Sequence, residues 1–219
     1  GDIFVVTQQC THIEGLLFDV APGVVQAASQ AAIKVTTGSQ CRVRRCRFMR
    51  QAHSIWVAPV FEATFTAEAC EIYDSVPGVA SCIQIDNGYD VSIIDTIISN
   101  VITAKPVNGI LITAAGDVVI GNSQAICCQQ GLNVYVEAGK ALASLWGSAS
   151  FFDNCGRGAS IGAVGGSVVR SVFDQCWFSS ASVDHGFIAF TSGAGSVDGL
   201  SLTNCDLYLN AANGFTAYS

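Results

Sequence analysis

Short motifs of one kind recur along the whole chain. Each starts with an apolar residue, usually has Gly, Asn or Asp two positions later, then a small residue, and ends on a second apolar residue. The clearest copy is Leu-Thr-Asn-Cys-Asp-Leu at 202–207, and seven more begin at Ile13, Val43, Ala67, Ile93, Ile120, Leu145 and Phe173, spaced 24–30 residues apart. A period of roughly 20–50 residues is typical of a solenoid.

A short segment with alternating side chains, such as Gly-Ile-Leu-Ile at 109–112, follows each motif, and no segment keeps a helical apolar stripe over three turns. Alternation of inward apolar and outward polar residues predicts β-strands. One repeat therefore contains three short strands. Stacked repeats predict an all-β fold, a single-stranded right-handed parallel β-helix of about eight coils with about 27 residues per coil. In that fold Ile83 lies above Ile110, and Cys176 lies above Cys205.

The second motif position forms the corner between two strands. It holds Gly15, Asp95, Asn122, Gly147, Gln175 and Asn204. Gly, Asn and Asp adopt a left-handed backbone most easily, so we expect that conformation at this corner. Arg45 and Ala69 do not fit the pattern, and we expect a different corner in their two coils.

One domain, residues 1–219, accounts for all the repeats. The last predicted strand, at 214–217, is followed by no capping element. Because an uncovered end of a β-rod exposes strand edges, we expect the sequence to be a segment of a longer chain, or a partner chain to cover its ends.

The composition of the chain limits the kinds of partner that it can bind. The net charge is −7, from 10 basic and 17 acidic residues, which argues against nucleic acid because binding there depends on basic side chains. No run of 18 apolar residues is present, so membrane insertion is not expected. Only 12% of the residues are charged, and such an outer surface suits partner chains or a neutral, hydroxyl-rich ligand.

Four of the ten cysteines, Cys46, Cys70, Cys176 and Cys205, fall on the small motif position. A free Cys behaves there as a small apolar residue, so we predict buried thiols, although pairs on adjacent coils are close enough for a disulfide. The spacing of a zinc site is missing, and we expect neither a metal nor a cofactor. Reduced thiols indicate assembly in a cytoplasm.

Two carboxylates, Asp90 and Asp117, take the same register on consecutive coils. Stacking would bring them to roughly 5 Å, the separation used by retaining glycosidases. The alternative is structural, because both residues follow Gly-containing turns whose amides Asp commonly binds.

A second candidate cluster comprises Asp153, Arg157, Asp184 and His185, which we expect on neighbouring loops after the third strand. These residues could supply an acid, a base and a sugar-orienting arginine. Loop residues are also charged simply because they are exposed to water, so both interpretations stay open.

Outward aromatic and basic residues are the candidates for glycan binding. Rings at Trp56, Tyr73, Trp177 and Tyr208, with Trp146 as a further case, could stack on sugars or pack between chains. Arg42, Arg44 and Arg47 point outward from one basic coil and form either an anion site or a solvated or subunit-facing band. The candidate glycan-binding set is Trp56, Tyr73, Trp177, Tyr208, Arg44, Arg47, Arg157 and His185.

The runs Val-Val-Ile-Gly-Asn-Ser at 118–123, Phe-Asp-Gln-Cys at 173–176 and Leu-Thr-Asn-Cys at 202–205 resemble the pectin-lyase-like family of parallel β-helices, in particular bacteriophage tailspike and tail-fibre proteins. The resemblance covers roughly residues 10–217. It implies homotrimers attached to other virion tail proteins, recognition of bacterial surface polysaccharide, and in some members its cleavage. The Asp-rich calcium site and the Arg base of the lyase members have no clear match.

Three functions stay open. The first is a tailspike or tail-fibre segment that binds bacterial surface polysaccharide, with cleavage as an endoglycosidase (a depolymerase) an open question. The second is a non-catalytic β-helical shaft of a virion or cell-surface fibre. The third is a free secreted polysaccharide hydrolase or lyase. The resemblance favours the first, and with it a place in the virion tail after assembly in the bacterial cytoplasm.

Overall fold

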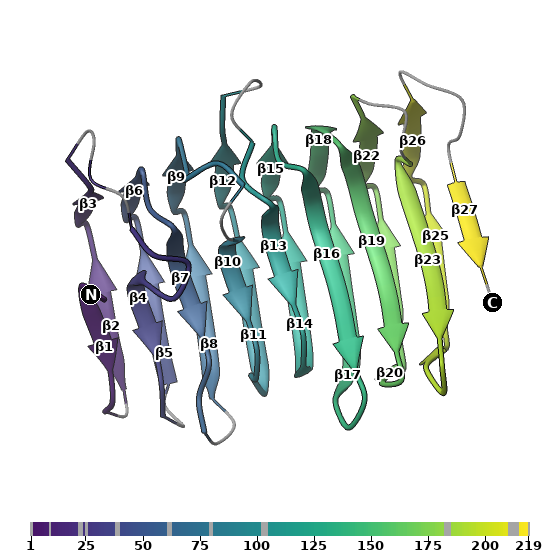
Figure 1. Ribbon diagram of the computed structural model, residues 1–219, viewed down its shortest axis with the longest axis horizontal. Coiled ribbons are helices and arrows are strands. Elements are labelled where there is room, and N and C mark those ends of the chain that lie inside the picture. The colour runs from purple at the N-terminus through teal and green to yellow at the C-terminus, as the bar shows by residue number, and fades with distance from the viewer. Residues whose placement is uncertain are drawn as a thin grey trace.

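The computed structural model describes residues 2–8, 10–21, 24, 26–37, 40–60, 63–78, 81–101, 105–181, 185–209 and 215–218. These residues form 27 β-strands in three sheets and no helix. Figure 1 shows the strands side by side along the long axis, with the two termini at opposite ends.

Sheet A contains nine strands, β1 (Phe4–Val6), β4 (Ala31–Val35), β7 (His53–Val57), β10 (Ser81–Ile85), β13 (Asn108–Ile112), β16 (Gln130–Glu137), β19 (Arg157–Val164), β23 (Phe187–Ser192) and β27 (Phe215–Tyr218). Sheet B contains ten, β2 (Thr11–Glu14), β5 (Gln40–Arg44), β8 (Thr64–Glu68), β11 (Asp90–Ile94), β14 (Ala115–Gly121), β17 (Ala141–Ser148), β20 (Ser167–Val168), β21 (Ser171–Asp174), β24 (Ser196–Val197) and β25 (Leu200–Thr203). Sheet C contains eight, β3 (Leu17–Asp19), β6 (Arg47–Met49), β9 (Glu71–Tyr73), β12 (Ile97–Ser99), β15 (Gln124–Ile126), β18 (Phe151–Cys155), β22 (Trp177–Ser180) and β26 (Asp206–Leu209).

The chain passes through sheets A, B and C in turn and then starts the next coil, so that β10 pairs with β7 and β13, all parallel. Ile83 pairs with Ile110 as predicted, and the amide of Asp206 donates to the carbonyl of Cys176 on the neighbouring coil. The eight strands of sheet C are separated by about seven turns of about 27 residues each. The predicted all-β parallel solenoid is confirmed, whereas its right-handed sense stays a prediction.

The core is a set of stacked columns inside the coil. Phe18 lies flat on Phe48 with ring centroids 4.9 Å apart, and Phe152 lies on Phe178 at 5.3 Å. One coil alone leaves its inner side chains uncovered at both ends, whereas stacking removes them from water, and burial stabilises by roughly 25 cal/mol per Å². The central part of this core is fully buried, for example at Ile33, Ile55, Ile83 and Ile93.

The corner between sheets B and C is left-handed in every coil. Gly15, Asp95, Asn122, Gln175 and Asn204 all have positive φ there. The expectation of a different corner at Arg45 and Ala69 was wrong, since their φ angles are 50° and 51°. The stacking of neighbouring coils therefore determines this backbone conformation, even for side chains that do not favour it.

One motif copy was predicted in the wrong register. The residue paired with Ile120 and Phe173 is Gly147, not Leu145, and the left-handed corner is therefore Ala149, with φ 45°. The error arose because this coil has no side chain at the expected apolar position. The ring of Phe173 fills that space, and a Cβ on Gly147 would lie 2.4 Å from Phe173 Cδ1.

The small motif position forms a polar ladder inside the corner. The hydroxyl of Ser123 donates to the carbonyl of Gly121 (2.9 Å) and accepts from the amide of Thr96 (3.1 Å). Cys46 and Cys70 donate in the same way to the carbonyl two residues earlier, at 3.4 and 3.5 Å. All ten cysteines are free thiols and eight are buried, with Cys10 exposed and Cys205 only half-buried. The predicted buried thiols are thus confirmed at Cys46, Cys70 and Cys176, whereas Cys205 was wrongly expected to be buried, because it lies in one of the last coils.

Candidate functional site

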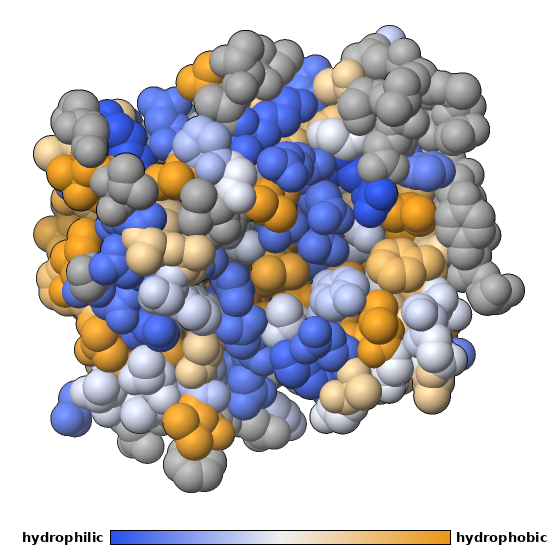
Figure 2. All heavy atoms as spheres, viewed as in Figure 1, coloured by the Kyte–Doolittle hydropathy of each residue, from blue (hydrophilic) through white to orange (hydrophobic). Residues whose placement is uncertain are grey.

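A hollow opens at the corner between sheets A and B because neighbouring strands differ in length. Ile112, the last residue of β13, pairs with Val134 of β16, so residues 135–137 of β16 extend beyond β13 and pair instead with residues 162–164 of β19. The loop between β16 and β17 therefore projects past the shorter turns beside it (Figure 1), and Figure 2 shows the recess on the lower outline of the molecule.

This cavity, the A–B hollow, has a volume of about 590 Å³ and is lined by residues 86–89, 114–116, 139–141 and Ala143. Its floor consists of two stacked turns. The amide of Gly116 donates to the carbonyl of Gly88 at 2.7 Å, and the amide of Asp117 donates to that of Tyr89 at 2.6 Å. A Cβ on Gly116 would lie 2.7 Å from the Tyr89 carbonyl oxygen, so only glycine permits this close approach. The floor is therefore a fixed backbone surface.

Asp90 and Asp117 lie at the edge of this floor. They are paired directly across β11 and β14, with Cα atoms about 4.8 Å apart by strand spacing, and both are exposed. The Ser144 hydroxyl donates to Asp117 Oδ1, whereas no side chain in the described part of the chain donates to Asp90. The turn amides do not bind these carboxylates, since the amides of Tyr89 and Gly116 donate to backbone carbonyls. Like charges directly opposite each other destabilise a sheet, and this pair is not explained by turn formation.

Two exposed aromatic rings accompany the pair. Tyr89 is 50% exposed and lines the A–B hollow. Trp146 is 44% exposed and follows Ser144 by two residues on β17, so both side chains lie on the outer surface of sheet B. Trp146 was predicted only as a further case, and Tyr89 was not singled out from the sequence. The exposed position of Tyr89 depends on the turn geometry, which alternation alone does not reveal.

Lys140 lines the A–B hollow, and its Nζ lies 3.3 Å from Oε2 of Glu137, which stands beside the wall. Asp86 lines the inner side and is held by three donors from three coils. Trp56 Nε1 donates at 2.6 Å, Gln84 Nε2 at 2.9 Å and Thr113 Oγ1 at 3.0 Å. Asp86 is thus fixed in place by its neighbours, whereas Asp90 and Asp117 keep free acceptor positions.

Trp56 does not lie beside the carboxylate pair. It belongs to sheet A, where Lys34 Nζ sits 4.0 Å above its ring centroid and the ring of His53 lies 4.9 Å away. Burial lowers the pKa of His53, and its ring nitrogens contact the carbonyls of Ala28 (2.7 Å) and Ser81 (2.9 Å). The Trp56 ring is therefore partly covered by side chains of its own sheet, and its indole supports Asp86.

Sheet C holds a separate group of the predicted residues. Trp177 and Tyr208 stack on each other with ring centroids 5.6 Å apart, and Trp177 Nε1 donates to Asp153 Oδ1 at 3.1 Å. The ring centroid of Tyr73 lies 5.9 Å from Cζ of Arg47. In parallel strands, side chains at neighbouring positions of adjacent coils cover one another's faces, which leaves less ring surface for a sugar.

The predicted cluster around Asp153 is divided between two sheets. Asp153 belongs to β18 in sheet C and Arg157 begins β19 in sheet A, separated by a corner at Asn154 with φ 51°. His185 lies on the coil next to Arg157, and its carbonyl accepts from the amide of Gly158 at 3.3 Å. Asp184 lies outside the described residues. The three described members therefore come from sheet C (Asp153), from sheet A (Arg157) and from the segment before β23 (His185).

The predicted basic band has carboxylate partners from adjacent coils. Arg42 pairs with Glu68, and Arg44 Nε lies 3.2 Å from Glu68 Oε1. Arg47 Nε donates to Glu71 at 2.7 Å. The hydrogen bond from Arg42 is the main cause that lowers the pKa of Glu68. These pairs favour a solvated or subunit-facing band over an anion site.

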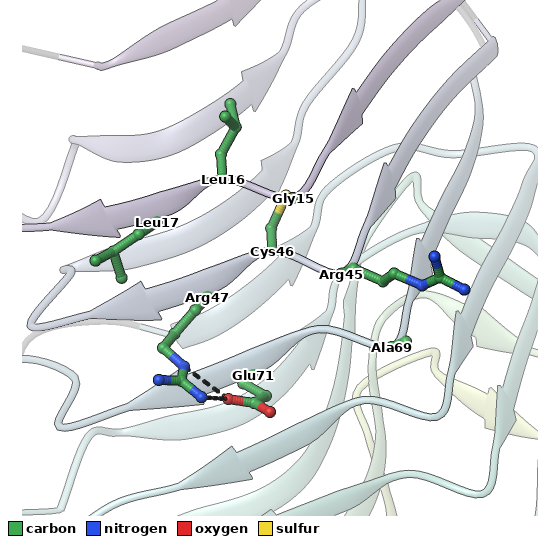
Figure 3. Close-up of a pocket in the computed structure, with 8 residues that line it drawn as sticks. All are labelled: Gly15, Leu16, Leu17, Arg45, Cys46, Arg47, Ala69 and Glu71. Carbon is green, nitrogen blue, oxygen red and sulfur yellow. Dashed lines mark hydrogen bonds and ion pairs between the residues drawn. The ribbon is translucent and has the colours of Figure 1, made fainter.

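The band borders a second hollow of about 410 Å³ at the corner between sheets B and C. Figure 3 shows Arg47 turned towards Glu71, whereas Arg45 points away from that pair. Leu16 and Leu17 line the other side and are 42% and 62% exposed. This surface is mixed in character, with paired charges beside exposed leucines.

Within the described ranges no three His, Cys, Asp or Glu side chains come together as a metal site would require. The same ranges contain no helix of the length and apolarity needed to cross a membrane. The sequence matches no protein-family model, and neither a curated protein nor a solved structure matches the chain. The A–B hollow and the fold are therefore the features of this protein that bear on its function.

Proposed function

We propose that the protein recognises bacterial surface polysaccharide at the A–B hollow, as the receptor-binding segment of a bacteriophage tailspike or tail fibre. The parallel β-helix is consistent with such polysaccharide-binding proteins. The observation that carries the proposal is the directly opposed pair Asp90 and Asp117 beside the exposed rings of Tyr89 and Trp146. Carboxylates accept hydrogen bonds from sugar hydroxyls, and aromatic rings cover the apolar faces of sugars.

The same pair can perform hydrolysis with retention. In that reaction one carboxylate attacks the anomeric carbon while the other protonates the leaving oxygen, so a glycosyl–oxygen bond forms as the glycosidic bond breaks. Asp117, whose orientation is fixed by the Ser144 hydroxyl, suits the nucleophile. Asp90, which keeps its acceptor positions free towards solvent, suits the acid in its protonated form, whereas its ionised form serves binding alone. Water then hydrolyses the glycosyl ester and returns a proton to Asp90.

The test uses a panel of bacterial surface polysaccharides, with binding and the release of reducing ends measured separately. We expect binding to at least one member. Asp90→Asn and Asp117→Asn should each abolish cleavage if hydrolysis occurs, while Asp198→Asn, which alters an exposed carboxylate far along the chain, should leave it unchanged. Binding without release of reducing ends would show that the protein recognises the polysaccharide but does not cleave it. If no member of the panel binds, the proposal is wrong.

The second candidate is a non-catalytic shaft in a side-by-side homotrimer that contacts other virion tail proteins. Exposed apolar side chains on sheets B and C favour it, since Leu17, Phe151 and Trp146 are 62%, 46% and 44% exposed. Sedimentation equilibrium distinguishes the candidates. A trimer that binds no polysaccharide would support the shaft. A monomer that cleaves polysaccharide would instead indicate a free hydrolase and exclude both the shaft and the tailspike assembly.

A further inference from the structure

We infer that the A–B hollow selects glycan segments without carboxylate, sulfate or phosphate groups. This inference rests on the proposed function and adds the substrate class of the same site. The low overall charge of the sequence does not distinguish a neutral ligand from an acidic one. The positions of the charges in the folded molecule do, and they favour a neutral ligand.

Negative charge is concentrated around the hollow. Asp86 lines it, Asp90 and Asp117 stand exposed at its edge, and Glu137 stands exposed beside its wall. The one cation among the lining residues, Lys140, is within 3.3 Å of Glu137. An anionic sugar placed on Tyr89 would therefore meet carboxylates on several sides and no unpaired basic group among the described lining residues.

The basic residues of the chain lie elsewhere or are already engaged. Arg42, Arg44 and Arg47 pair with Glu68 and Glu71 in the first coils. Lys34 covers the Trp56 ring and Lys105 donates to the carbonyl of Asn154.

Apart from Lys140, the exposed basic residue that shares the strand register of the Asp90 and Asp117 pair is Arg170. It comes directly before Ser171, which pairs with Leu145, and thus falls two coils beyond Asp117. Two coil spacings separate its backbone from that of Asp117 by about 10 Å. Among the described residues no ion pair joins Arg170 to Asp90 or Asp117, and the hydrogen bond that Asp117 accepts comes from Ser144.

The charge distribution has a functional consequence. A carboxylate, a sulfate ester or a phosphodiester on the ligand carries one negative charge and would be repelled by the carboxylates of Asp90 and Asp117, because the interaction scales with the product of the charges. Hydroxyl and N-acetyl groups carry no such penalty and can donate to the free carboxylate oxygens of Asp90. Selection against anionic glycans therefore follows from the same pair that serves recognition.

The experiment compares matched ligands. Each uronate-containing member of a bacterial polysaccharide panel is tested beside its own carboxyl-reduced form, so that the backbone stays the same and only the charge changes. We expect the reduced form to bind at least about tenfold more tightly at low salt. Raising the salt to about 0.5 M, where the Debye length is roughly 4 Å, should narrow the difference.

Substitutions of Asp90 and Asp117 test whether these two carboxylates cause the difference in affinity between the uronate and the reduced forms. The double variant Asp90→Asn with Asp117→Asn should reduce the discrimination to less than about threefold, since it removes two of the repelling charges, whereas Asp198→Asn should preserve it. Equal or tighter binding of the uronate forms to the unmodified protein would overturn this inference while leaving the proposed function intact. Failure of every neutral and acidic polysaccharide to bind would remove the proposed function, and this inference with it.

Discussion

At the scale of single residues, the corner between sheets B and C shows how stacking overrides local preference. Asn122 and Asp95 adopt a left-handed backbone there, and so do Arg45, Ala69 and Ala149. For a residue with a Cβ this conformation costs roughly 1–2 kcal/mol. The corner is maintained because the strands on both sides are fixed by their neighbours in the adjacent coils.

Replacing one of these residues by glycine should therefore stabilise the protein. We expect Ala149→Gly to raise the free energy of unfolding by about 0.5–1 kcal/mol, since relief of the left-handed strain exceeds the added freedom of the unfolded chain. Ala67→Gly is the matched control, because Ala67 is a buried strand residue without positive φ. It should lose about 1 kcal/mol. Urea denaturation measures both, and an equal loss in the two variants would contradict the argument.

The residue scale also marks the limits of prediction from the sequence. Apolar anchors such as Ile93 and Ile120 were placed in the correct register because their side chains face the core in every coil. The copy at Leu145 was misplaced by two positions, since the true anchor is Gly147 and a ring from the next coil occupies its space. A substitution that is compensated by a neighbouring coil cannot be seen in one repeat alone.

At the scale of elements, the polar ladder inside the same corner ties successive coils together. The hydroxyl of Ser123 accepts from the buried amide of Thr96 at 3.1 Å, and the hydroxyl of Ser150 accepts from the amide of Ser123 at 3.2 Å. Ser123 and Ser150 thus provide an acceptor for an amide that the corner removes from the strand ladder. Ser123, Thr96, Cys46 and Cys70 all donate to the carbonyl two residues earlier, which is the contact that Ser, Thr and Cys share at that motif position.

Two substitutions at Ser123 should separate the contribution of its hydrogen bond to the free energy of unfolding from the contribution of its packing. Ser123→Ala leaves the Thr96 amide buried without an acceptor, and we expect a loss of about 1–3 kcal/mol in the free energy of unfolding. Ser123→Cys keeps a donor and a weak acceptor of the kind found at Cys46 and Cys70, so its loss should be about 1 kcal/mol or less. Chemical denaturation of both variants is the measurement. Equal losses would show that the ladder contributes little.

The strands themselves could be predicted from the alternation of side chains, but the A–B hollow could not. It depends on the additional residues 135–137 of β16, which find partners in β19 rather than β13. Strand length beyond the repeated motif leaves no periodic signal. The candidate binding residues were likewise chosen by exposure alone, and the structure distributes Trp56, Arg44 and Trp177 over three different sheets.

At the scale of the whole molecule, the rod is held together by stacking alone. Ten cysteines are present in a chain of 219 residues, yet all of them are free thiols. Several lie in contact with polar groups inside the corners, such as Cys82 beside the Ser75 hydroxyl at 3.1 Å. The stability of the fold should therefore be independent of the redox conditions, unlike that of a disulfide-bonded domain.

Thiol titration tests this conclusion for the whole chain. In the native protein we expect Ellman's reagent to label Cys10 rapidly, because it is exposed, and the half-buried Cys205 more slowly. The other eight thiols should react only after denaturation, since burial excludes the reagent and also raises the pKa of Cys41, Cys70 and Cys176 to about 11. The thiolate is the reacting form.

Cys10→Ser is the control and should remove the rapid phase alone. A reductant should leave the melting temperature unchanged within about 2 °C, whereas breaking a native disulfide would cost about 2–5 kcal/mol and lower it by several degrees. Fewer than ten reactive thiols in the denatured, unreduced protein would instead reveal a disulfide. The small motif position would then carry covalent bonds between coils, and stacking alone would no longer explain how the rod holds together.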